Sequence, residues 1–404
     1  MCQDNICTSL EEAVALLLTA IPSTLPTQVV NLDDALGRVA AQDICAPFDH
    51  PPFDRSPLDG YAAKAADTAS ACREAPVILK VVGEMPPAPC LQLGEAIRIM
   101  TGAPIPAGAD CVIRQEDTNY GSDTVRVYVA HKPFQNYCHQ GEDVRQGSCC
   151  ISCGTMLDFA AIGVLSLLGQ TTISVFSQPT VGLMTTGSEL VEVGMPLTAG
   201  KIYNSNQHLL SARMRELDAL PRVLPKCADD PDCIAEAISC ALDDCQFLVT
   251  TGGVSVGKKD FMPEVCRLLD GNLLFQGIPI KPGAPAMAFQ CKGKLVLCLS
   301  GNPFAAAATF ELLARPVIMR LQGQSINSAQ FATAVLQTPF QKASPGRRFL
   351  RAYLQGGKVY LPEGGMEVHS SGALFSMMGC NCMIDIPAGT PCLSVGQEVN
   401  VIPF

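Results

Sequence analysis

The sequence has no apolar run of the roughly 20 residues that a transmembrane helix requires. Its first residues, Met1 to Ser9, also lack the basic stretch with which a signal peptide begins. We therefore predict a cytoplasmic protein that does not enter a membrane.

Positive charge is scarce. The chain has 28 Lys and Arg residues against 38 Asp and Glu residues, so its net charge is −10. Nucleic-acid binding depends on clustered Lys and Arg side chains that contact phosphates. The sequence therefore argues against a nucleic-acid partner.

Transition-metal motifs are missing as well. The five histidines are scattered, and the one CxxC, Cys150 to Cys153, has no second CxxC or HxxxH to complete a zinc site. A disulfide framework is typical of short secreted chains, whereas this chain has 404 residues and no export signal. We interpret most of the 20 cysteines as small buried hydrophobic residues.

The hydrophobic fraction of 48% and the length of 404 residues are sufficient for several folded domains. We predict an α/β multidomain protein. Residues 178–326 alternate between strand and helix patterns and form a doubly wound, parallel-sheet domain. Residues 47–146 form a β-rich inserted domain, residues 1–46 and 147–177 an elongated mixed α/β N-terminal unit, and residues 327–404 a β-barrel-like C-terminal domain.

Within the α/β domain the patterns predict five strands and four helices. The expected strands are Thr180–Met184, Arg222–Cys227, Phe247–Val249, Leu273–Ile280 and Lys294–Leu299. The expected helices are Asn206–Leu217, Pro231–Leu242, Asp260–Leu269 and Phe304–Leu321.

The stretch from Gln246 to Met262 reads as strand, loop and helix. An apolar run ends at Val249, and Thr250 to Gly253 interrupt it. Two adjacent glycines allow backbone N–H groups to face an anion, and a following helix offers its positive end. For this loop alone, a tight turn with a helix cap is the favoured interpretation.

Similar loops follow other predicted strands. Thr185 to Glu189 repeats the TTG pattern, Leu299 to Pro303 reads LSGNP, and Lys281 lies in the loop from Gly277 to Pro285. Ligands of open α/β sheets bind outside the carboxyl ends of the strands. We therefore predict a pocket for a phosphorylated ligand with a divalent cation.

Two acidic clusters leave alternatives open. Asp54, Ser56 and Asp59 form either an Asx or Ser turn or a loop that presents a charge to a ligand. Asp229 and Asp230 either cap a helix at Pro231 or lie on the rim of the pocket.

Several motifs, in this order and with these gaps, resemble the molybdopterin molybdenumtransferase family, which includes bacterial MoeA and the gephyrin E domain. They are PPFDRSPLDGYA, RIMTGAPIPAGAD, GEDVRQG, TTGSEL, IYNSN, LVTTGGVSVGKKDF, IPIKPG and LSGNPFAAAATFE. The resemblance spans nearly the whole chain. It implies an elongated homodimer that consumes adenylylated molybdopterin and molybdate, uses Mg²⁺ and releases AMP. Molybdopterin adenylyltransferase and molybdoenzyme delivery proteins are candidate partners.

The resemblance and the loop chemistry together give a predicted site. The candidate catalytic residues are Asp59, Glu189, Asp260 and Lys281. The candidate metal ligands are the carboxylates of Asp143, Glu189, Asp229, Asp230 and Asp260. The candidate cofactor-binding residues are Thr101, Thr186, Gly187, Ser188, Thr251, Gly252, Gly253, Ser255, Gly257, Pro282, Gly283, Ser300, Gly301, Asn302, Pro303, Arg351 and Ser371.

The chain departs from the family at Ala284, where a second lysine is usual, and at Gln276 and Gly277, where some members add a basic residue. The alternative function is therefore a non-catalytic or altered-substrate paralogue that binds molybdopterin or its adenylylated form. The sister reaction, adenylylation of molybdopterin by a free-standing α/β domain, is disfavoured because units other than the α/β domain cover more than half of the chain.

Overall fold

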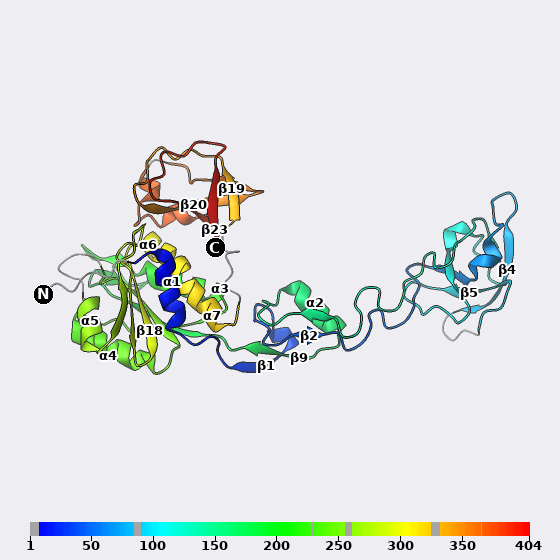
Figure 1. Ribbon diagram of the computed structural model, residues 1–404, viewed down its shortest axis with the longest axis horizontal. Coiled ribbons are helices and arrows are strands. Elements are labelled where there is room, and N and C mark those ends of the chain that lie inside the picture. The colour runs from blue at the N-terminus through cyan, green and yellow to red at the C-terminus, as the bar shows by residue number, and fades with distance from the viewer. Residues whose placement is uncertain (1–7, 85–89, 228, 255–260, 325–331, 365) are drawn as a thin grey trace. The chain divides into compact units, whose positions relative to one another are not determined.

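The structure is a computed structural model, and it describes residues 8–84, 90–227, 229–254, 261–324, 332–364 and 366–404. The chain separates into two units (Figure 1). Unit 1 comprises residues 1–42, 153–162 and 172–404, and unit 2 comprises residues 43–152 and 163–171. The division into four domains stays a prediction.

Unit 1 is built on a six-stranded sheet with the order β13-β10-β14-β18-β17-β15. The strands are β13 (Leu220–Val223), β10 (Thr180–Thr185), β14 (Phe247–Thr251), β18 (Lys294–Leu299), β17 (Met287–Cys291) and β15 (Asn272–Gln276). The first four are parallel, whereas β17 is antiparallel to both of its neighbours. The predicted parallel sheet is therefore mixed at one side.

The antiparallel strand β17 was missed in the sequence because its turn signal is weak. Cys291 pairs with Lys294, so β17 and β18 are joined by Lys292 and Gly293 alone. Both turn residues have positive φ, 52° and 72°. Two-residue hairpins of this kind usually carry Asn-Gly or Asp-Gly, and Lys-Gly is not a strong marker.

Helices cover both faces of the sheet, which confirms the doubly wound architecture. One face packs against α1 (Leu10–Thr19), α3 (Ser205–Glu216), α6 (Pro303–Thr309) and α7 (Arg315–Leu321), and the other against α4 (Pro231–Leu242) and α5 (Met262–Leu268). In β14, Phe247 and Val249 belong to the first core and Leu248 to the second. Alternate side chains point to opposite faces, so this short strand is apolar throughout.

Local signals place the helix ends. Ser9 and Glu12 form a capping box at the start of α1, with the Glu12 N–H donating to the Ser9 hydroxyl at 3.2 Å. Pro231 at the first turn and Asp230 as the cap start α4, whose predicted limits are confirmed. The predicted helix Phe304–Leu321 is α6 and α7 joined by a π-helical segment, Phe310–Ala314.

Two predicted strands have the wrong limits: Arg222–Cys227 shares only residues 222 and 223 with β13, and Leu273–Ile280 extends too far. The strand β15 ends at Gln276, and Gly277 has a φ of +93°, which no regular strand adopts. The chain then forms β16 (Ile280–Lys281), which pairs in parallel with β20 of the C-terminal region.

The C-terminal region is a closed five-stranded barrel, as the sequence predicts. Its strands are β19 (Ala332–Leu336), β20 (Arg347–Gln355), β21 (Lys358–Tyr360), β22 (Cys382–Ile386) and β23 (Glu398–Pro403). They pair in the order β20-β21-β19-β23-β22, and β22 pairs again with β20 to close the ring. Unit 1 also contains the ribbons β1 (Thr27–Asn31) with β9 (Thr172–Phe176) and β11 (Leu190–Val191) with β12 (Ile202–Tyr203).

Unit 2 contains a five-stranded sheet with the order β6-β3-β5-β4-β7. The strands are β6 (Cys111–Arg114), β3 (Gly60–Ala63), β5 (Glu95–Ile99), β4 (Val77–Glu84) and β7 (Thr124–Val127). In β7 the valines are buried and Thr124 and Arg126 are exposed, as the alternating pattern predicts. A short ribbon of β2 (Ile44–Cys45) and β8 (Cys149–Ile151) also belongs to unit 2, and α2 spans Phe159–Leu167.

Most cysteines are not buried, so that prediction is wrong. Of the described cysteines only Cys111, Cys245, Cys266, Cys291, Cys298 and Cys382 are buried, and the larger part are exposed or half-buried.

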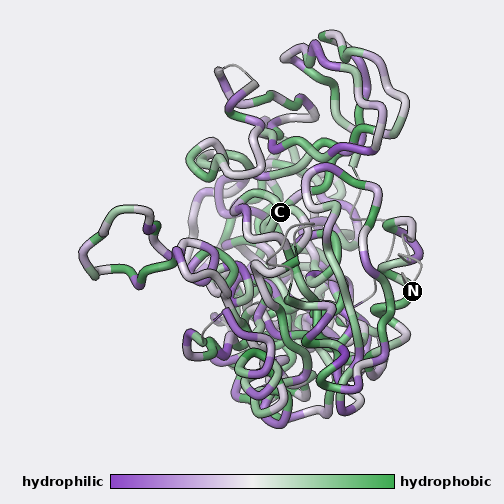
Figure 2. Tube along the Cα trace, turned by 90° about the vertical axis from the view of Figure 1, so that its left-hand side faces the viewer, coloured by the Kyte–Doolittle hydropathy of each residue, from purple (hydrophilic) through white to green (hydrophobic). Residues whose placement is uncertain are grey.

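Within the described ranges, no helix combines the length and hydrophobicity needed to cross a membrane. Hydrophobic and hydrophilic segments alternate along the trace in Figure 2.

Candidate functional site

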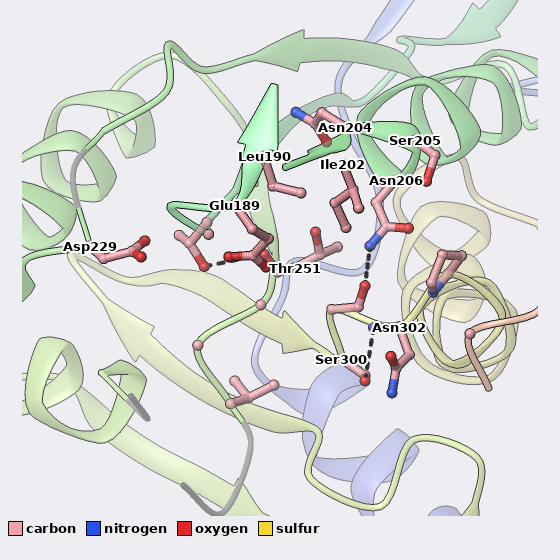
Figure 3. A pocket seen from close by; sticks show the side chains of 18 of the residues that line it. Glu189, Leu190, Ile202, Asn204, Ser205, Asn206, Asp229, Thr251, Ser300 and Asn302 are labelled. Atoms are coloured by element: carbon pink, nitrogen blue, oxygen red, sulfur yellow. Dashed lines mark hydrogen bonds between the residues drawn. The ribbon is translucent and has the colours of Figure 1, made fainter. Parts of the chain in front are cut away.

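A cavity of about 540 Å³ lies at the carboxyl ends of β10, β14 and β18 (Figure 3). Its volume is in the range of small-molecule sites. The residues that follow the three strands line it, because parallel strands end at the same edge of the sheet. The predicted residues that line the cavity are Thr186, Gly187, Glu189, Asp229, Thr251, Gly252, Gly253, Ser300, Gly301, Asn302 and Pro303.

Glycines allow the loops to approach each other. Gly252 and Gly253 have φ values of +91° and +70°. A Cβ atom on Gly252 would lie 2.5 Å from the Thr186 carbonyl oxygen. The Gly252 N–H itself donates to the Leu299 carbonyl at 3.1 Å, so it holds the loop instead of facing an anion.

The start of α3 forms a further wall, which the sequence reasoning did not assign to the site. Asn204, Ser205 and Asn206 line the cavity. The Asn204 amide donates to the Thr185 hydroxyl and the Asn206 amide to the Gly301 carbonyl, each at 2.8 Å. The missed signal was the Asn cap in IYNSN, which places the positive end of a 12-residue helix at the cavity.

Two carboxylates, Glu189 and Asp229, face the cavity, on the other side of it from Ser300 and Asn302 in the view of Figure 3. The Ser188 N–H donates to Asp229 Oδ2 at 2.8 Å, which ties Asp229 to the loop that carries Glu189. Ser188 thus contributes to the site through its backbone and does not line the cavity.

Asp230 acts differently from its neighbour. Its carboxylate accepts the Cys233 N–H at 3.0 Å and caps α4. This hydrogen bond lowers the pKa of Asp230 because it stabilises the ionised form. The two alternatives for this acidic pair are therefore both realised, one by each residue.

Glu189 and Asp229 place two carboxylates on the lining of the cavity. Mg²⁺ is commonly bound by one or two carboxylates together with substrate phosphates and water. In the part of the chain that the structure describes, no group of three or more His, Cys, Asp or Glu residues could hold a metal ion. Glu189 and Asp229 would therefore hold the ion only together with phosphate oxygens.

Basic side chains are absent from the described lining of the cavity. The predicted residues Lys281, Pro282 and Gly283 lie outside that lining, and the Lys281 side chain is exposed on β16. Gly283 has a packing role, because a Cβ atom there would lie 2.1 Å from Thr309 Cγ2 on α6.

Arg351 is fully buried, with an exposed fraction of 0%, and does not line the cavity. Its guanidinium donates to the Ser376 hydroxyl and the Ser370 carbonyl, both at 2.6 Å, and also to the Ala373 carbonyl. It stacks 3.6 Å from the centroid of the Phe304 ring. Burial lowers the pKa of Arg351 to about 10, so the side chain remains a cation at neutral pH.

The loop that Arg351 holds reaches the cavity. The Phe304 N–H at the start of α6 donates to the Ser371 carbonyl at 2.9 Å, and Gly372 lines the cavity. Arg351 and Ser371 therefore act on the cavity through the position of Gly372.

The remaining described candidates lie in unit 2. Asp59 Oδ1 accepts the Thr101 N–H and the Thr101 hydroxyl, both at 2.7 Å, and these bonds lower the pKa of Asp59. Asp143 is exposed. The Asp54 carboxylate accepts from the Tyr137 hydroxyl at 2.5 Å and the Gln140 N–H at 2.8 Å, two residues that are distant in the chain, so these bonds are not those of a local Asx turn.

Ser56, by contrast, forms a local turn, its hydroxyl donating to the Leu58 carbonyl at 2.5 Å. The predicted residues Ser255, Gly257 and Asp260 lie outside the described residues.

A doubly wound domain with a glycine-lined cavity at its strand ends defines a small-molecule-binding α/β protein. Three family descriptions match the chain: "MoeA N-terminal region (domain I and II)" at residues 8–169, "Probable molybdopterin binding domain" at 182–320, and "MoeA C-terminal region (domain IV)" at 333–404.

Curated relatives agree with these matches. The molybdopterin molybdenumtransferase of Bacillus subtilis strain 168 is 37% identical over 386 residues, which cover 93% of this chain and 89% of that protein. The enzyme of the same name from Staphylococcus epidermidis is 34% identical, and the match covers 92% of this chain and 90% of that protein. The crystal structure of a molybdopterin biosynthesis MoeA protein from Pyrococcus horikoshii has a TM-score of 0.83 and 31% identity, covering 98% of this chain and 100% of that chain. The chain belongs to the molybdopterin molybdenumtransferase family.

Proposed function

We propose that this protein is a molybdopterin molybdenumtransferase in molybdenum cofactor biosynthesis. It consumes adenylylated molybdopterin and molybdate, and it releases AMP as the metal is placed on the dithiolene. The observation that carries the proposal is the cavity at the ends of β10, β14 and β18, with its glycine loops and two carboxylates. Relatives that bear this enzyme name match more than nine tenths of the chain.

The cavity has a polar and an apolar side, which suits the two kinds of group in this substrate. Leu190 of β11 and Ile202 of β12 are paired residues, and both line the cavity. Ile202 is 56% exposed, so its apolar side chain is open to a ligand in the cavity. We place a fused heterocyclic ring of the substrate on this pair and the phosphates towards the glycine loops and the start of α3.

A divalent cation, Mg²⁺, is part of the proposal. Bound between Glu189, Asp229 and the substrate phosphates, it would neutralise charge during cleavage of the phosphoanhydride. Ser188 holds Asp229 in position through its N–H. The proposed catalytic residues Asp59, Asp260 and Lys281, the homodimer and the cytoplasmic location also belong to the proposal.

The test is AMP release by the purified full-length protein from adenylylated molybdopterin, with and without molybdate and Mg²⁺. We expect release that requires both. Tight binding of the substrate with no AMP release in the presence of any oxyanion would overturn the proposal and favour the binding-only paralogue, to which the alanine at position 284 gives some support.

Neighbouring carboxylates provide a matched pair of variants. We expect Glu189→Gln and Asp229→Asn to lower the rate of AMP release by about tenfold or more, because each removes a charge from the proposed ion site. Asp230→Asn keeps a good helix cap and lies outside the cavity lining, so it should release AMP at nearly the normal rate. Equal rates in the Asp229→Asn and Asp230→Asn variants would contradict the assignment.

A further inference from the structure

The ribbon of β2 and β8 in unit 2 places two cysteines opposite each other. The antiparallel register pairs Ile44 with Ile151 and Cys45 with Cys149, and it shifts between these two pairs so that Cys150 is an extra residue of β8. Both isoleucines are buried, whereas both cysteines are exposed. The apolar pair thus points inwards, and the two thiols share the outer side of the ribbon.

The backbone geometry of such a pair suits a disulfide. Directly opposed residues of antiparallel strands have Cα atoms about 4.5–5.5 Å apart. A disulfide requires a Cα separation of about 4.4–6.8 Å, and the usual separation of cross-strand partners falls within that range. The two thiols are also near enough to interact, since desolvation and then the Cys149 thiol are the main causes that raise the pKa of Cys45.

Both sulfurs are thiols and neither is held by a strong hydrogen bond. The contacts of Cys149 Sγ are with the Ile151 carbonyl at 3.6 Å and the Ser152 hydroxyl at 3.8 Å. Sulfur hydrogen bonds at these distances are weak, so the side chain can rotate towards Cys45. Cys150, the next residue, is half-buried and directs its thiol to the Ser148 carbonyl at 3.5 Å.

We propose that Cys45 and Cys149 are a redox-modification site at which a low-molecular-weight disulfide, such as oxidised glutathione, forms an intramolecular disulfide. The thiolate of one cysteine attacks the reagent, one thiol leaves, and a mixed disulfide remains. The second thiolate then attacks the protein sulfur of the mixed disulfide and releases the second thiol. In total, two protein thiols are oxidised, one reagent disulfide is reduced, and two protons are transferred to the two released thiols.

The position of the pair gives the bond a structural consequence. The chain passes from unit 1 to unit 2 between residues 42 and 43 and returns between residues 152 and 153, directly beside this ribbon. A bond between Cys45 and Cys149 would close a loop of roughly 100 residues that contains most of unit 2, and long loops lose the most freedom in the unfolded state. Oxidation should therefore stabilise unit 2.

The test uses the full-length protein, reduced and then treated with oxidised glutathione at about pH 8.5, where more thiolate is present. We expect peptide mapping without reductant to show the Cys45 peptide linked to the Cys149 peptide. Thermal unfolding of unit 2 should move upwards by several degrees, and dithiothreitol should reverse the shift.

Cys45→Ser and Cys149→Ser should each abolish both the cross-link and the shift. Cys72→Ser is the matched control, because Cys72 is an exposed cysteine of unit 2 outside the ribbon, and it should change neither. Glutathione bound separately to Cys45 and Cys149, or a cross-link of Cys149 to a cysteine other than Cys45, would overturn the proposal. These readouts do not involve AMP release, so they are independent of the proposed function.

Discussion

Gly252 shows how a single residue determines the shape of the cavity. Its φ of +91° is unfavourable for any residue with a side chain. A Cβ atom at this position would also clash with the Thr186 carbonyl oxygen, at a distance of 2.5 Å. We predict that Gly252→Ala destabilises unit 1 by about 1–3 kcal/mol and weakens substrate binding, because the loop must move. Gly346→Ala, where a Cβ atom would meet nothing within 4 Å, is the control. Denaturant unfolding measures the stability and calorimetry measures substrate binding. A Gly252→Ala variant with unchanged stability and unchanged substrate affinity would contradict the predicted backbone strain.

Asp59 allows a prediction about pH. Its pKa is lowered because the Thr101 N–H and hydroxyl stabilise the carboxylate. Thr101→Val removes the hydroxyl donor and should raise the pKa of Asp59 towards its ordinary value. Since the folded pKa is the lower one, the stabilising contribution of Asp59 is present above the unfolded pKa and is lost as the pH falls through the folded pKa.

Carboxyl NMR titration of labelled aspartate measures this shift. Asp54, whose pKa is lowered by Tyr137 and Gln140, is an internal control that should titrate as in the unchanged protein. A pKa of Asp59 that does not move in Thr101→Val would show that the hydroxyl is not an effective donor.

At the scale of elements, the π-helical segment between α6 and α7 positions a buried acid. Glu311 is 5% exposed and accepts two bonds from Arg213, at 2.6 and 3.1 Å, and one from Arg315 at 3.2 Å. Glu311→Gln would remove the buried counter-charge that two half-buried guanidinium groups share. We predict a loss of about 3 kcal/mol in the free energy of unfolding of unit 1.

The same arginine supplies the control for this prediction. Glu216 also pairs with Arg213, at 2.9 Å, but its side chain is 66% exposed. Glu216→Gln should cost less than about 0.5 kcal/mol, because water and salt screen exposed pairs. Denaturant unfolding compares the two variants, and equal losses would show that burial does not govern this network.

At the scale of the whole molecule, the two units have separate cores. The sheet of unit 2 packs around Tyr61, Leu79 and Val125, whereas the described lining of the cavity belongs to unit 1. We predict more than one thermal transition, with the adenylylated substrate raising the transition of unit 1 by more than that of unit 2. Scanning calorimetry with and without substrate measures this, since a ligand stabilises the state that binds it. An equal upward shift of every transition would contradict the prediction that the two units unfold separately.

The sequence by itself determined the architecture. Apolar runs such as Phe247–Val249, the cap at Asp230 and Pro231, and the alternation in Thr124–Val127 are local signals, and the structure has the expected strands and helix there. It also predicted that the loops after β10, β14 and β18 converge, because the order of elements in a parallel sheet brings the strand ends to one edge.

Only the tertiary structure decided how neighbouring residues divide their roles. Asp229 faces the cavity and Asp230 caps a helix, although the two are adjacent and identical in type. Arg351 is buried against Phe304, and Asn206 reaches Gly301 across a separation of 95 residues. The direction of a side chain depends on packing with residues that are distant in the chain, and local sequence patterns contain no information about those contacts.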